Sequence, residues 1–144
     1  MKTIPLSSAT DEVERALGVE IAALTPDEVA DALGLWGSER WLPLAPSPTE
    51  SDLDVWRRVH PFPTWISRVV IITDLSFMDE RGAFELVGSE IDDFVGTYEK
   101  RFGETFFNGD VLVVAIEDRK VWLLHHEGLH ITAEVEPNAR EIHR

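Results

Sequence analysis

Three of the five histidines in this 144-residue chain lie within six positions, in the segment LLHHEGLHI. Imidazole nitrogens and carboxylate oxygens are common zinc ligands. If two strands turn at Glu127 and Gly128, His125 faces His130 with Cβ atoms about 5.5 Å apart. His126 then points to the opposite face. The spacing therefore makes His125 and His130 candidate zinc ligands, with Glu127 or Glu134 as a third.

A second interpretation is that these histidines end a buried strand, where they bond to neighbouring groups or contact solvent. No metal motif such as His-Glu-x-x-His is present. The chain has no cysteine to act as a nucleophile, and no Gly-x-Ser-x-Gly motif. Asp92 and Asp93, adjacent on a predicted helix, diverge by about 100° and do not form a catalytic pair. We therefore expect no metal, no cofactor and no enzymatic activity, and keep the histidine site as the alternative.

Three strand-like runs position these histidines, at residues 111–116, 121–126 and 129–135. Short polar turns separate the runs, which predicts an antiparallel meander. The predicted register, which gives the sheet one apolar face, pairs Ala115 with Trp122, Val113 with Leu124, and Leu124 with Ile131.

Helical patterns precede the meander. The strongest predicts an amphipathic helix over 89–103, capped by Ser89 and ended by Gly103, because its apolar residues recur at helical spacing. Two earlier helices are expected over 7–18, capped by Ser8 or Thr10 and ended by Gly18, and over 25–34, capped by Thr25.

Between these helices we expect a loop over 35–49, a short helix from Ser51 that stops at Pro61, and a buried strand over 69–73 with a hairpin partner at 82–87. The predicted fold class is α+β. N-terminal helices and one long amphipathic helix pack on a mainly antiparallel sheet that ends in a three-strand meander. Residues 1–144 are expected to form a single domain.

The charge balance is strongly acidic, with 27 Asp and Glu against 13 Lys and Arg, a net charge of -14. Direct binding of nucleic acid is disfavoured, because phosphate neutralisation requires clustered cations. A solubilising surface or a surface for a basic protein both fit this composition. The candidate partner-binding patch consists of Asp79, Glu80, Glu90, Asp92 and Asp93. An acidic mimic of nucleic acid is a further alternative.

Neither membrane insertion nor secretion is indicated by the sequence. The longest apolar run, VLVVAI, is too short to span a bilayer, and the first 25 residues hold no apolar run of signal-peptide length. We expect a cytoplasmic protein.

The stretch FFNGDVLVVAIEDRKVWLLHHEG resembles the sheet segment of the SUKH superfamily, the Smi/Knr type of domain. The similarity lies in a Gly-Asp pair before an apolar strand, a short turn, and a second strand that ends near a His-Glu pair. The matching residues are Gly109, Asp110, Val111, Leu112, Val121, Trp122, His126 and Glu127. The segment RWLPLAP is similar to the Leu-Pro element of the family, whereas its Asn-Gly-Gly turn and closing helix are missing.

This resemblance implies an α+β bacterial immunity protein that binds and neutralises a toxin, often a nuclease. It implies no catalytic residues, because the expected activity is inhibition by complex formation.

Overall fold

The computed structural model describes residues 1–59 and 68–136. These residues form a seven-stranded sheet in which every paired strand is antiparallel to its neighbour. The strand order is β1-β4-β3-β5-β6-β7-β2. The strands are β1 (Lys2–Ile4), β2 (Leu42–Pro43), β3 (Arg68–Thr73), β4 (Ala83–Val87), β5 (Val111–Ala115), β6 (Lys120–Leu124) and β7 (Leu129–Glu134).

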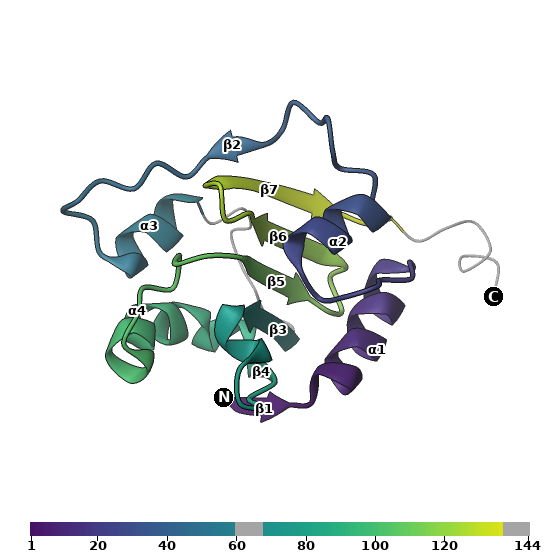
Figure 1. Cartoon of the computed structure of the whole chain (residues 1–144), viewed down its shortest axis with the longest axis horizontal. Coiled ribbons are helices and arrows are strands. Elements are labelled where there is room, and N and C mark those ends of the chain that lie inside the picture. The colour runs from purple at the N-terminus through teal and green to yellow at the C-terminus, as the bar shows by residue number, and fades with distance from the viewer. Residues whose placement is uncertain (60–67, 137–144) are drawn as a thin grey trace.

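Helices cover both faces of this sheet. They are α1 (Leu6–Leu17), α2 (Pro26–Ala32), α3 (Asp52–Val59) and α4 (Ile91–Phe102), with short 3-10 turns η1 (Asp74–Phe77) and η2 (Gly88–Glu90). Figure 1 shows α1 and α2 on one side of the strands and α3 and α4 on the other. The predicted α+β class and the packing of a long amphipathic helix on an antiparallel sheet are confirmed.

The two sheet faces hold separate apolar cores, whereas the sequence predicted one apolar face. On the α3/α4 face, Trp56 meets Trp122 edge-on with ring centroids 5.4 Å apart. On the α1/α2 face, side chains of β5 and β6 pack against Val13 and Leu17. All five residues of β5 are buried, because a strand covered on both sides has no solvent-facing position.

Local signals set most helix ends. Thr25 accepts a hydrogen bond from the Glu28 N–H at 3.2 Å, as predicted for an N-cap. Gly18 and Gly103 end α1 and α4 in the left-handed conformation. The predicted caps Ser8 or Thr10 and Ser89 are wrong: α1 begins directly after Pro5, and η2 leads into α4, so neither helix has a side-chain cap.

The predicted register of the meander is also wrong. Trp122 pairs with Val113 instead of Ala115, so β6 is shifted by two residues along β5. A shift of two residues keeps Trp122 and its partner on the predicted face of the sheet. Between β6 and β7 the shift is one residue, so that Leu124 pairs with His130. The cause is a three-residue turn. His125 donates its N–H to the Leu129 carbonyl, and Gly128 takes a left-handed φ of +88°, which completes the longer hairpin loop.

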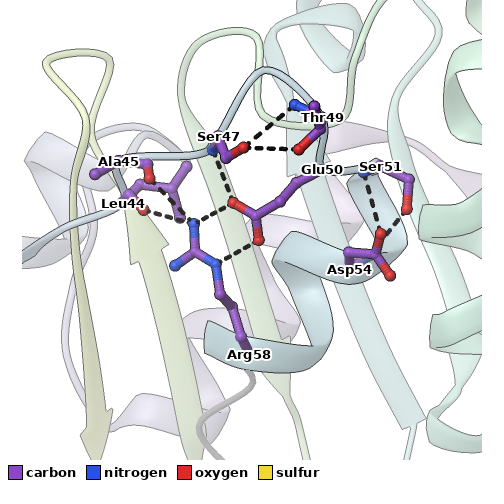
Figure 2. Close-up of polar contacts among 8 residues, drawn as sticks. All are labelled: Leu44, Ala45, Ser47, Thr49, Glu50, Ser51, Asp54 and Arg58. Carbon is purple, nitrogen blue, oxygen red and sulfur yellow. Dashed lines mark hydrogen bonds and ion pairs between the residues drawn. The ribbon is translucent and has the colours of Figure 1, made fainter.

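The segment predicted as a loop over 35–49 contains β2, which pairs with β7 at the sheet edge. Arg58 of α3 forms hydrogen bonds to the segment that follows β2, as Figure 2 shows. Its guanidinium donates to the Leu44 and Ala45 carbonyls at 3.0 and 3.2 Å, and to both carboxylate oxygens of Glu50 at 2.7 and 3.0 Å. Ser51 and Asp54 exchange reciprocal bonds that start α3. The predicted stop at Pro61 lies outside the described residues.

No helix within residues 1–59 and 68–136 combines the length and apolar character needed to cross a membrane.

Candidate functional site

The predicted pairing of His125 with His130 does not occur, because the one-residue shift places them on opposite faces of the sheet. His130 is 8% exposed, and its Nδ1 accepts the Trp122 Nε1–H at 3.2 Å. Burial, and then the charge of Arg58, lower the pKa of His130. Across the described ranges, no three His, Cys, Asp or Glu side chains are grouped so that they could hold a metal ion.

His125 and His126 instead form two neighbouring histidine–aspartate pairs. Their rings lie 4.0 Å apart between centroids. The Nε2 of His125 lies 2.9 Å from the Asp27 carboxylate at the start of α2. The Nδ1 of His126 lies 3.0 Å from Asp110 Oδ1, which also accepts the His126 backbone N–H at 2.7 Å. This hydrogen bond to Asp110 is the main reason that the pKa of His126 is raised.

A further carboxylate, Asp74, belongs to the same group. The pKa of Asp74 is raised, first by partial burial and then by the charge of Asp110, with a smaller contribution from Glu104. Gly109 allows this approach, because a Cβ at this position would overlap the Asp74 carboxylate. The Gly109 φ of +122° also suits glycine.

Aromatic side chains adjoin the histidines. Trp36 is 48% exposed and stacks on Trp41, with ring centroids 5.3 Å apart. The same Trp36 ring meets His125 edge-on at 5.9 Å. Trp41 is fixed by donating its Nε1–H to the Leu35 carbonyl at 2.8 Å. Trp41 therefore supports one face of the exposed Trp36 indole.

All of these groups gather where β3 and β6 end and β5 and β7 begin. We call this region the acidic end of the sheet. It comprises Trp36, Asp27, Asp74, Asp110, His125, His126, Glu127 and the exposed Phe77 and Met78. Carboxylates next to exposed aromatic and thioether side chains suit contact with a basic surface.

The five acids predicted as a partner-binding patch fall into two groups. Asp79 and Glu80 are exposed and lie at the acidic end, in the turn that precedes β4. Glu90, Asp92 and Asp93 follow β4, so the length of this strand, roughly 17 Å, separates the two groups.

The acids of the second group already have partners. Glu90 accepts the Val87 N–H at 2.9 Å and contacts the terminal amino group. Asp92 lies 3.6 Å from Arg57, and Asp93 lies 3.9 Å from Arg101. Only Asp79 and Glu80 therefore share a surface with the acidic end, and their role in binding stays a prediction.

Asp27, Asp74 and Asp110 were not predicted as site residues. Asp74 and Asp110 are 36 positions apart and meet because β3 pairs with β5. The signal in the sequence that could have identified Asp74 and Asp110 is that each flanks an apolar strand and that Asp110 follows a glycine.

Comparison of the chain with protein-family models, with curated proteins and with solved structures gave no match in any of the three.

Proposed function

We propose that this chain is a non-enzymatic binding protein of the immunity type, which neutralises a basic toxin by covering its surface. The observation that carries the proposal is the gathering of carboxylates and exposed apolar side chains at the acidic end of the sheet. Trp36, supported by Trp41, provides a rigid aromatic anchor. Asp27, Asp74 and Asp110 provide negative charge at the same end of the sheet.

The net charge of -14 supports the same proposal. A strong opposite field accelerates encounter with a cationic partner and disfavours acidic competitors. Tryptophan is among the residues that most often dominate binding energy at protein interfaces. Charge would therefore bring the partner in, and the aromatic anchor would hold it.

The resemblance to the SUKH superfamily suggests the class of partner. In that family the bound protein is commonly a toxin, often a nuclease. A nuclease presents cations to the phosphates of its substrate, so its cleft is complementary to an acidic surface.

The test first searches the neighbouring genes for a basic nuclease-toxin domain, which the proposal requires, and then uses that domain. Equimolar addition of the protein is expected to abolish nucleic-acid cleavage. Calorimetry should show one-to-one binding whose affinity falls between 50 and 200 mM salt. Absence of such a domain from the neighbourhood, or a toxin that neither binds nor is inhibited, would contradict the proposal.

A pair of variants locates the binding surface. Trp36→Ala is expected to weaken affinity at least tenfold, because it removes the anchor. Val87→Ala is the control, since Val87 is also 48% exposed but is the last residue of β4, at the end of that strand away from the acidic end. Equal affinities of the two variants would place the interface elsewhere.

A further inference from the structure

A small pocket opens at the acidic end, between the start of α2 and the turn η1. Its volume is about 140 Å³. Its apolar lining comes from Leu24, Pro26, Ile72 and Phe77, while Asp74 and Asp110 supply carboxylates. The pocket thus combines apolar walls with negative charge.

The other polar side chains that line this pocket are already engaged. Thr25 accepts the Glu28 N–H. The Thr73 hydroxyl lies 2.9 Å from the buried Tyr98 hydroxyl. The carboxylates are also bonded, Asp110 through Oδ1 to His126 and Asp74 to the Asp110 backbone N–H, but their remaining lone pairs can accept bonds from a ligand.

Charge in the pocket is unbalanced. Asp74 lies close enough to Asp110 and Glu104 for both charges to disfavour its ionised form. Two described groups oppose them: the backbone N–H of Asp110, which bonds to the Asp74 carboxylate, and the charge of His126, which already bonds to Oδ1 of Asp110. A cation that entered from outside would relieve this repulsion.

We propose that this pocket receives one arginine side chain of the partner protein. The inference rests on the proposed function and names the chemistry by which the partner is recognised. The aliphatic stem of the arginine lies along Leu24, Pro26 and Ile72, and its guanidinium bonds to the carboxylates. Phe77, 49% exposed, offers a ring face on which a planar guanidinium stacks.

Other occupants fit less well. A divalent ion needs several oxygen ligands and gains nothing from apolar walls. An apolar side chain would bury the two carboxylates without a partner, which is costly. Lysine has the correct charge but cannot stack or bond in a fork.

The first experiment uses N-acetyl-arginine methylamide as a probe, with the citrulline analogue as an uncharged control of nearly the same shape. In ¹⁵N–¹H NMR spectra the arginine probe is expected to shift the amides of Leu24, Asp74 and Asp110 in a saturable way. The lysine analogue should bind more weakly, and the citrulline analogue should not saturate. Equal shifts by the arginine and citrulline probes would overturn the inference.

Variants then test the pocket directly. Asp74→Asn is expected to reduce probe affinity at least fivefold, and Phe77→Ala is a second variant at an exposed position. Asp79→Asn removes the same charge from the same end but outside the pocket lining, so it should change affinity less than twofold. An Asp74→Asn protein that keeps its spectrum and binds the probe unchanged would refute the assignment.

The toxin domain separates the two proposals. Loss of toxin affinity in Asp74→Asn and Phe77→Ala, with Asp79→Asn unchanged, supports the arginine pocket. If Trp36→Ala loses affinity while Asp74→Asn does not, the binding function stands and the pocket assignment falls. If the arginine probe binds but no toxin does, the immunity function falls alone.

Discussion

A single oxygen of Asp110 holds His126 at two points, its ring Nδ1 and its backbone N–H. The side chain of His126 is 56% exposed, so the interaction is open to solvent. Its effect on the pKa of His126 nevertheless exceeds the opposing effect of desolvation. Because Asp110 also lines the pocket proposed to receive arginine, the protonation of His126 and the charge of that pocket are coupled.

Replacing Asp110 with Asn should therefore lower the pKa of His126 toward the ordinary value of 6.5. Glu127→Gln is the matched control, because Glu127 raises the pKa of His126 only by its charge and contributes least. The shift should be clearly larger for Asp110→Asn in an NMR titration of the imidazole signals. Equal shifts in the two variants would show that the hydrogen bond does not govern this histidine.

At the scale of elements, the attachment of β1 to the sheet depends on a glycine in the hairpin of β3 and β4. Gly82 precedes β4 with a φ of +85°, and a Cβ there would overlap the carbonyl oxygen of Ile4 in β1. This edge strand pairs with β4 through three residues. Its attachment therefore requires a residue without a side chain at position 82.

Gly82→Ala should lower the free energy of unfolding more than Gly37→Ala does. Both positions have left-handed φ, +85° and +84°, so both variants bear backbone strain of about 1–2 kcal/mol. Gly37 has open space around it, whereas Gly82→Ala must also displace β1. Urea unfolding should show an additional loss of at least about 1 kcal/mol. Equal losses in the free energy of unfolding would mean that displacing β1 does not destabilise the fold.

The Arg58 contacts in Figure 2 hold the segment from β2 to α3. The Arg58 side-chain bond is the largest cause that lowers the pKa of Glu50, to about 2. A carboxyl whose folded pKa is depressed stabilises the fold above its ordinary pKa, and loses this effect as the pH falls toward 2. The segment should thus loosen only in strong acid.

Arg58→Lys should release this segment at neutral pH, because an ammonium group cannot reach two carbonyls and both Glu50 oxygens. Hydrogen exchange of the Ser47 and Glu50 amides should accelerate at least tenfold. Arg57→Lys is the control, since Arg57 makes a 3.6 Å contact with Asp92 at the surface. Similar exchange in the two variants would contradict this role of Arg58.

Some features decided by near neighbours in the chain could be predicted from the sequence, although the caps of α1 and α4 and the registers across the short meander turns could not, and strands that pair with distant segments could not. Thr25 caps α2 because its partner is three residues away. The hairpin of β3 and β4 was likewise predicted, whereas β1 and β2 were not, because their partners lie far along the chain. One unrecognised left-handed glycine, Gly128, moved His125 and His130 to opposite faces and changed the candidate site.

For the whole molecule, His126 and His130 have opposite effects on how the free energy of unfolding depends on pH. The pKa of His130 is lowered by folding, so the unfolded chain binds more protons and stability rises with pH through this range. The pKa of His126 is raised, so its contribution is complete below the ordinary pKa of 6.5 and is lost as the pH rises through the folded value.

His130→Gln should therefore flatten the rise in stability below pH 6.5, and His126→Gln should remove a loss of stability above pH 6.5. Urea unfolding at several pH values measures both slopes. The comparison rests on slopes, so a general loss of stability when Trp122 loses its acceptor does not affect it. Changes of the same sign in the two variants would contradict the assigned shifts.

The sheet order also governs when the protein can fold during synthesis. Both edge strands, β1 and β2, lie within the first 43 residues, but they pair with β4 and with β7, which ends at Glu134. The apolar face of α1 packs on strands that leave the ribosome later. β1 can therefore pair once β4 has emerged, whereas β2 stays unpaired until β7 has been synthesised. The sheet is consequently expected to close at both edges only after β7 is available, and until then β2 is an unpaired segment that a chaperone could protect.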